Sequence, residues 1–398
     1  MKIVYVLGAG YSYNANFPLQ AEILSRIYQL DKNITGDAID FLTSIYGKKD
    51  LPALEDVYTL LDSAVSRREN FHGLDFNDLD NIRDNLTRSI LYIMHSSSAN
   101  FFNNYSGKFP PIISDRKSNL ITNKVRSFYN ANAEHFIRER ISNGRKSDAF
   151  SIISLNWDTL LEDSIYECKK HLNGKYNVDI DYCCYTNPLK DSPHTNSLVQ
   201  RSRDIYNIKI LKLHSSVNWL LCPNCNRLFT GLGSKEDIWT LYMETIKCPK
   251  CSWESDFIAS KKTPTLMPFL ISPTFLKNVD SNTHINMIWH NAFVELSEAD
   301  KIVIIGYSLP EADYKIRTLL KRSIKKNSYI EIILKRKDNF TKNSDESLRK
   351  FYPSERYKCF FPKSLYQVKF NFSGIENYFG KIHKMINGKN YFKKRNLN

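Results

Sequence analysis

Short apolar segments alternate along the chain with longer segments in which apolar residues recur at helical spacing. The short segments cover residues 2–7, 150–155, 208–213, 302–305 and 329–334. Runs of this length, rich in β-branched residues, are typical of strands buried on both faces of a parallel sheet. Helical spacing follows at 18–30, 159–170 and 314–325. The alternation predicts an α/β fold with a Rossmann-like parallel sheet.

A long segment between the first two predicted strands has the periodicity of helices. Apolar residues recur every three or four positions over 51–61, 79–94 and 125–141, which predicts core-facing stripes of a helical insertion over residues 31–150. Ser, Asn, Gly and Pro are frequent over 96–119, where we expect a long loop. Residues 173–207 are polar, and we expect irregular structure there.

The net charge of +14 among 398 residues favours nucleic acid or an acidic partner. Part of the excess is local, because residues 315–350 hold twelve Lys or Arg against four Asp or Glu. A solvated basic surface is the alternative. No run of about 18 apolar residues occurs, so we expect no membrane span. The N-terminus lacks the features of a signal peptide, and we expect a cytoplasmic protein.

Four of the eight cysteines form two Cys-x-x-Cys pairs, Cys222/Cys225 and Cys248/Cys251. In a cytoplasmic protein such pairs favour a metal over a disulfide. Four thiolates complete a tetrahedral Zn²⁺ site without a position for water. We therefore expect a structural zinc ion in a module over 215–262; the alternative is that one pair no longer binds metal.

A glycine-rich turn, Gly8-Ala9-Gly10-Tyr11-Ser12, follows the first predicted strand directly. A strand, a glycine turn and a helix open dinucleotide-binding folds, because the glycines permit a tight turn and the helix N-terminus presents N–H groups to phosphate. The third glycine of the full motif is absent, since Tyr13 stands there. A structural turn without phosphate remains the alternative.

Polar residues also follow the later strands, where open α/β sheets bind their ligands. Asn156 and Asp158 come after the second strand, and His214 after the third. A helix cap is the alternative for the first pair, and a structural histidine for the last. Near neutral pH, histidine is the natural general base. Gly306 and Ser308 follow a later strand, where a tight turn is the alternative to ligand binding.

Taken in order, these motifs resemble the sirtuin-like superfamily over about residues 1–335. The Asn156-Trp157-Asp158 motif and the Lys212-Leu213-His214 motif are most similar to those of bacterial sirtuin-like NAD⁺ hydrolases of antiphage defence. The resemblance implies an NAD-binding domain and cleavage of NAD⁺ to nicotinamide and ADP-ribose in abortive infection. Residues 336–398 are left as a C-terminal extension whose fold the pattern does not define.

The resemblance also implies roles for individual residues. Asn156 would position the nicotinamide ribose or the attacking water, and His214 would act as the base. The implied NAD⁺-binding residues lie in the two glycine turns and after the second strand: Gly8, Ala9, Gly10, Ser12, Asp158, Gly306 and Ser308.

Two other functions remain open: a sirtuin-type protein deacylase, and a non-enzymatic NAD or nucleic-acid sensor. Deacylating sirtuins carry Pro-Asp-Phe-Arg after the glycine turn, where this chain has Phe17-Pro18-Leu19-Gln20, and His-Gly where it has His214-Ser215. These departures favour hydrolysis of free NAD⁺. An unregulated NAD⁺ hydrolase is toxic, so we expect a separate defence partner, such as a HerA-type ATPase or an Argonaute-like protein. We also expect a homo-oligomer, with nucleic acid bound directly or through the partner.

Overall fold

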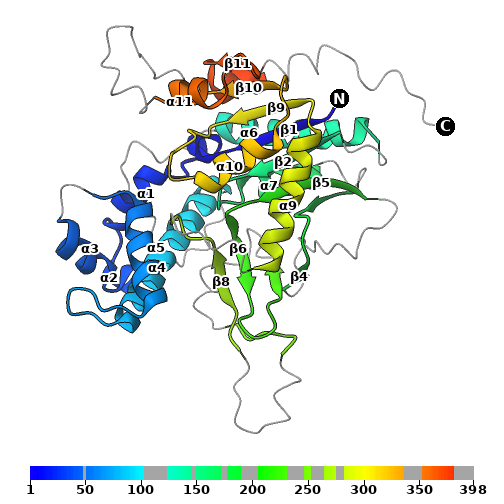
Figure 1. The fold of residues 1–398 in the computed structure, drawn as a ribbon. Coiled ribbons are helices and arrows are strands. Elements are labelled where there is room, and N and C mark those ends of the chain that lie inside the picture. The colour runs from blue at the N-terminus through cyan, green and yellow to red at the C-terminus, as the bar shows by residue number, and fades with distance from the viewer. Residues whose placement is uncertain are drawn as a thin grey trace.

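The computed structural model describes residues 1–47, 51–102, 123–144, 149–171, 177–189, 205–230, 246–251, 264–274, 282–335 and 352–380. A sheet of seven parallel strands crosses the upper half of Figure 1 in the order β11-β10-β9-β1-β2-β5-β3. In that order the strands are Gln367–Asn371, Tyr329–Ile333, Lys301–Ile305, Ile3–Leu7, Phe150–Ser154, Tyr206–Lys212 and Val178–Asp181. The predicted α/β fold with a parallel sheet is confirmed.

The first strand of the chain lies inside the sheet rather than at its edge. From β1 the chain builds β2, β5 and β3 on one side, and later β9, β10 and β11 on the other. Ile3 of β1 stands opposite Phe150 of β2 and Lys301 of β9, so the three strands begin and end at the same level. The turns that follow them therefore meet at one edge, where the strand order reverses. Such a switch point is the usual ligand site of open α/β sheets.

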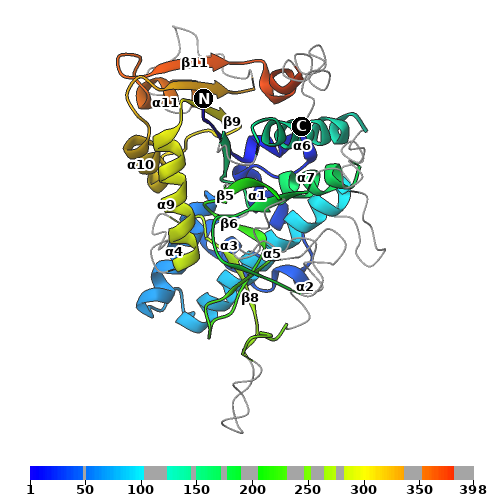
Figure 2. The same ribbon diagram turned by 90° about the vertical axis from the view of Figure 1, so that its right-hand side faces the viewer.

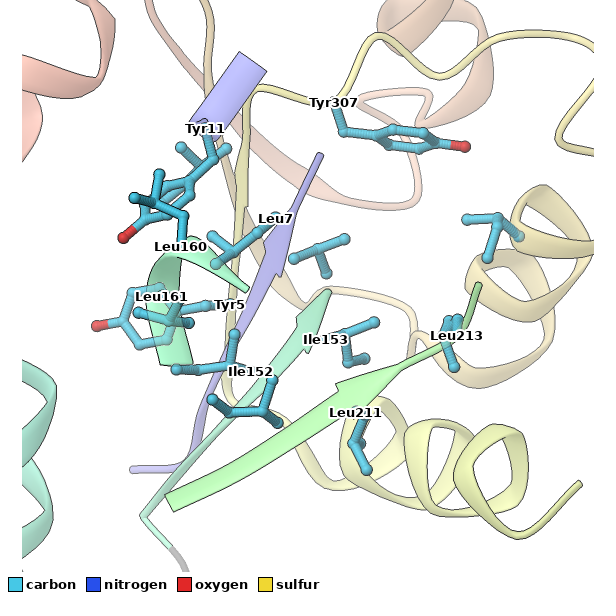
Figure 3. Close-up of a cluster of buried hydrophobic side chains, with 14 of the residues drawn as sticks. Tyr5, Leu7, Tyr11, Ile152, Ile153, Leu160, Leu161, Leu211, Leu213 and Tyr307 are labelled. Carbon is cyan, nitrogen blue, oxygen red and sulfur yellow. The ribbon is translucent and has the colours of Figure 1, made fainter. Parts of the chain in front are cut away.

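Helices cover both faces of this sheet. Figure 2 shows α6 (Asn123–Ser142) and α7 (Leu160–His171) on one side, and α9 (Thr283–Glu298) and α10 (Tyr314–Ser323) on the other. Successive strand residues point to opposite faces. In Figure 3, Ile152 points toward Leu161 of α7, whereas Ile153 points toward Leu211 and Leu213. Burial on both faces explains why the central strands β1, β2 and β9 are almost wholly apolar.

A helical unit lies beside the sheet, at the left of Figure 1. Its helices are α1 (Gln20–Ile27), α2 (Lys32–Thr35), α3 (Ala38–Tyr46), α4 (Leu54–Arg67) and α5 (Phe76–Phe102). The predicted apolar spacing is realised, since α4 buries Leu54, Val57, Tyr58 and Leu61. No helix in the described part of the chain is long and apolar enough to cross a membrane.

A second, smaller sheet lies below the first in Figure 1, in the order β4-β7-β6-β8. Its strands are Thr186–Pro188, Leu228–Thr230, Ser215–Leu221 and Met267–Leu270. A separate apolar cluster of Leu220, Phe229 and Leu266 surrounds three of the paired cysteines. Strand β6 begins directly after His214, so the chain passes from the main sheet into this unit at the predicted site.

Two sequence expectations are wrong. Residues 173–207 are not irregular throughout, because β3 and β4 lie there. Strand β3 is a short edge strand in which Asp alternates with apolar residues, a pattern that is weak in so few residues. The first part of the loop expected over 96–119 is helical instead, since α5 continues to Phe102; residues 103–119 lie outside the described residues.

Part of the expected C-terminal extension joins the main sheet. Helix α11 (Pro353–Phe360) precedes β11, which pairs in parallel with β10 and forms the edge of the sheet. Tyr357 of α11 donates a hydrogen bond from its hydroxyl to the carbonyl of Tyr307, over 2.9 Å. This segment therefore packs against the turn after β9.

Candidate functional site

Three neighbouring strands end side by side, because β1 pairs with β2 and β2 pairs with β5. The residues that follow them, Ala9, Asn156 and His214, line one cleft with about 550 Å³ of empty space, part of it open to solvent. The other lining residues surround these three: Pro18, Gln20, Ile23, Met94, Leu155, Trp157, Asp158, Ile271, Pro273 and Asp313.

Asn156 is held in one orientation at the cleft. Its Nδ2 donates to the carbonyl oxygen of Gly8 over 3.1 Å and to the hydroxyl oxygen of Ser12 over 3.2 Å. Since only the NH₂ group of a carboxamide can donate, these bonds fix which way the amide faces. Its Oδ1 is buried and has no hydrogen-bond partner among the described residues. A buried polar atom without a partner costs about 1–3 kcal/mol, so a ligand or water with a donor group would stabilise it.

Asp158 has a structural role in addition to its place at the cleft. Its Oδ1 accepts a hydrogen bond from the backbone N–H of Leu160 over 3.1 Å, at the start of α7. This bond orders the turn that leads into α7, although Thr159, not Asp158, directly precedes the helix. Burial raises the pKa of the Asp158 carboxyl, and the nearby Lys212 ammonium opposes that rise. Ser12, which the resemblance also selected, is buried beside Asn156.

His214 is followed by a residue in the left-handed region. Ser215 has a φ of 64°, a conformation that glycine adopts most easily. This explains why the resemblance places glycine after the histidine. The Ser215 hydroxyl donates to the carbonyl of His214 and accepts from the N–H of Ile271 over 2.8 Å. These bonds offset the strain and hold the turn that carries His214.

The two glycine turns pack against each other. The N–H of Gly8 donates to the carbonyl of Ile305 over 2.9 Å, and that of Gly10 to Gly306 over 2.8 Å. A Cβ on Gly10 would lie 2.8 Å from the Cα of Gly306. These glycines therefore permit close backbone approach, while their amides are engaged within the protein. Their predicted contact with NAD⁺ stays a prediction.

The helix expected over 18–30 is α1, which begins at Gln20. Two 3₁₀ turns, Ala9–Tyr11 and Tyr13–Ala15, lie between the glycine turn and this helix. The first turn of α1 still reaches the cleft through Gln20 and Ile23.

Ser308 lies apart from the cleft. It is exposed, and its carbonyl accepts a hydrogen bond from Arg356 Nε over 2.9 Å. The lining residues that were not predicted include Trp157 and Asp313. Trp157 stands inside the Asn-x-Asp motif, and its Nε1 has no partner in the described part of the chain. Asp313 precedes α10 and accepts from the hydroxyl of Tyr307 over 3.0 Å; its helix-cap position was the available signal.

Four cysteine sulfurs gather in the second sheet. The Sγ atoms of Cys222, Cys225, Cys248 and Cys251 all lie within 4.8 Å of one another. Two Sγ–Sγ distances, Cys222 to Cys251 and Cys225 to Cys248, are 3.8 Å. Sulfurs at tetrahedral corners, about 2.3 Å from a zinc ion, lie about 3.8 Å apart. The donor set fits Zn²⁺ with every coordination position filled by protein.

The sequence matches no protein-family model and no curated protein. Solved structures that are similar include a complex of a Sir2 homologue with NAD, at 12% identity over 97% of this chain and 90% of that chain, with a TM-score of 0.40. A Sir2 homologue mutant in complex with 2'-O-acetyl ADP ribose is 13% identical over 100% of this chain and 95% of that one, with a TM-score of 0.39. Structural similarity at this level identifies no ligand or reaction for this chain.

Proposed function

We propose that this protein is an NAD⁺ hydrolase that cleaves the bond between nicotinamide and ribose. The observation that carries the proposal is that Asn156 and His214 line one cleft, and that the buried Oδ1 of Asn156 lacks a partner among the described residues. A fixed acceptor suits a ribose hydroxyl or an attacking water. The cleft lies where the strand order reverses, the usual place for a nucleotide in such sheets.

The charges of the cleft support the cationic end of NAD⁺ as its occupant. Two carboxyl groups, Asp158 and Asp313, line it, and none of the described lining residues is a lysine or arginine. The nicotinamide ring of NAD⁺ carries a positive charge, and the ribose carbon gains positive charge as the bond breaks. Acidic groups stabilise both charges, whereas they disfavour the diphosphate. We therefore assign this cleft to the nicotinamide riboside half.

The reaction needs a leaving nicotinamide, a water and a base. The bond between N1 of nicotinamide and C1 of ribose breaks, and its electron pair neutralises the ring. Water forms the new bond to C1, and its proton passes to His214, which acts as the general base. Asn156 orients the ribose or the water through Oδ1, and the products are nicotinamide and ADP-ribose.

An enzyme that consumes free NAD⁺ without control poisons its own cell. The proposal therefore includes regulation by a separate partner, such as the HerA-type ATPase or Argonaute-like protein expected above. The motif resemblance to antiphage NAD⁺ hydrolases supports abortive infection as the biological role. Zinc has no part in cleavage in this proposal, since four thiolates leave no open coordination position.

Incubation of the purified chain with NAD⁺, with and without DNA and neighbouring gene products, followed by chromatography of the products, tests the proposal. We expect nicotinamide and ADP-ribose in equal amounts without any peptide. A general base contributes about 10²–10⁴-fold, so His214→Ala and Asn156→Ala are expected to lower kcat by at least 100-fold. His290→Ala, at an exposed histidine outside the cleft, is the matched control and should retain activity.

Three outcomes would contradict the proposal. Strict dependence of nicotinamide release on an acylated peptide would identify a deacylase. Tight NAD⁺ binding without turnover, with and without DNA and neighbouring gene products, would identify a sensor. A loss of less than tenfold in His214→Ala would reject the histidine as the base.

A further inference from the structure

Lys212 is fully buried at the end of β5, directly before the turn that carries His214. Its Nζ donates a hydrogen bond to the backbone carbonyl of Asp158. The same Nζ lies 3.0 Å from Oε1 of Glu162, in the first turn of α7. A single ammonium thus joins β5 to the segment that follows β2.

Strands β5 and β6 bind this segment from one side. The carbonyl of Trp157 accepts from the N–H of Val217 over 2.9 Å and from the hydroxyl of Ser216 over 3.2 Å. With Lys212 on the carbonyl of Asp158, two consecutive carbonyls of the segment are bound by the chain that carries His214. Together with the bonds of Asn156 to Gly8 and Ser12, these bonds connect the backbone beside Asn156 to the chain that carries His214.

The charges around Lys212 do not explain its presence by stability alone. Three buried carboxyl groups, Asp158, Glu162 and Asp163, lie around one buried ammonium. A buried ion pair is often replaced by apolar residues of similar size with no loss of stability, because desolvation offsets the attraction. A bond to a backbone carbonyl cannot be replaced in that way, since the carbonyl then loses its donor.

We infer that Lys212 is a positioning residue: its bond to the Asp158 carbonyl fixes the position of Asn156 relative to His214 across the cleft. The inference rests on the proposed function, which supplies the reaction that needs Asn156 and His214 in these positions. Lys212 is absent from the described lining of the cleft, so it acts through the residues it holds.

Two variants separate the carbonyl bond from the ion pair. Lys212→Met removes both, whereas Glu162→Gln removes the ion pair and leaves Lys212 free to donate to Asp158. Because a misplacement of about 1 Å can cost about 100-fold in rate, we expect Lys212→Met to lower kcat for NAD⁺ cleavage between 10- and 100-fold with KM changed less than threefold. Glu162→Gln is expected to retain kcat within about threefold.

A double variant guards against simple misfolding. Lys212→Met with Glu162→Met replaces the pair by apolar side chains, so it should fold while still lacking the donor to Asp158. Amide hydrogen exchange of residues 155–160 measures how firmly this segment is held, and it needs no turnover. We expect the exchange to be faster in both Lys212 variants. This readout still decides the inference if the wild-type chain does not cleave NAD⁺, an outcome that would reject only the proposed function.

The inference would be overturned if the double variant folds and shows wild-type hydrogen exchange over 155–160, or if it keeps the wild-type kcat. It would also be overturned if Glu162→Gln lowers kcat as much as Lys212→Met does. Failure of the double variant to fold would also overturn it, since Lys212 would then serve stability.

Discussion

Asp163 is a buried carboxyl group, only 6% exposed, close to Lys212. Burial raises its pKa to about 7, although the hydroxyl of Thr159 donates to its Oδ2 over 2.7 Å and lowers it. The folded protein therefore keeps this proton at pH values where the unfolded chain has lost it. The stabilising contribution is complete below about pH 4, near the unfolded pKa, and is lost as the pH rises to about 7.

The Asp163→Asn variant tests this pH dependence. Asparagine stays neutral and keeps an oxygen that accepts from Thr159, so the variant does not lose stability as the pH rises. We expect its free energy of unfolding, relative to wild type, to increase by about 1–2 kcal/mol from pH 5 to pH 8 in denaturant titrations. The control is Asp37→Asn, whose carboxylate is exposed. If the free energy of unfolding of Asp163→Asn differs from that of wild type by the same amount at pH 5 and pH 8, Asp163 is already ionised in the folded protein at pH 5.

At the scale of elements, the turns after β1 and β9 depend on each other for space. A Cβ on Gly10 would meet the backbone of Gly306 at 2.8 Å, and neither turn is a flexible side chain that can move aside. We expect Gly10→Ala to lower the free energy of unfolding by about 1–3 kcal/mol, as overpacking does. Thermal unfolding with and without NAD⁺ measures the effect on the turn and on ligand binding together.

Gly380 provides the matched control for this substitution. A Cβ there would meet nothing within 4 Å. Gly380→Ala should therefore change the stability by no more than about 0.5 kcal/mol. Equal stability of the two variants would mean that the turns separate at no cost, and the switch-point geometry would lose its support.

At the scale of the whole molecule, the second sheet has its own small core around the cysteines. Since metal binding contributes to folding of such modules, Cys222→Ser is expected to lose zinc and to lower the yield of soluble protein. Metal analysis should find about one zinc ion per wild-type chain. Cys359→Ser, at an exposed cysteine outside the cluster, should keep that zinc. Well-folded wild-type protein without metal would contradict the zinc assignment.

The basic stretch over 315–350 is partly used inside the fold. Arg317 and Lys321 lie over the ring of Phe360, at 5.0 and 4.5 Å from its centre. Arg322 and Lys325 are exposed, while residues 336–350 lie outside the described residues. Contact of this surface with nucleic acid or a protein partner stays a prediction.

The elements with strong local patterns were predictable from the sequence. Each buried strand is a short apolar run, because both faces of a parallel sheet are covered, and the four-Cys spacing is a local property of two turns. Asn156 and His214 were predictable as neighbours for the same reason: each follows such a run, and parallel strands end at one edge. Strands β3 and β4 were not predicted, because short, partly polar strands lack a distinctive hydrophobic period.

Other features depend on contacts between residues far apart in the chain. The order of the strands decides that Asp313 faces the same cleft as Asn156. Tertiary packing also decides that Lys212, which reads as the polar end of a strand, is buried against the carbonyl of Asp158. No local pattern encodes these outcomes, because burial and hydrogen-bond partners are set by segments more than fifty residues away. The sequence determined which residues end the strands, and the tertiary structure decided what those residues meet.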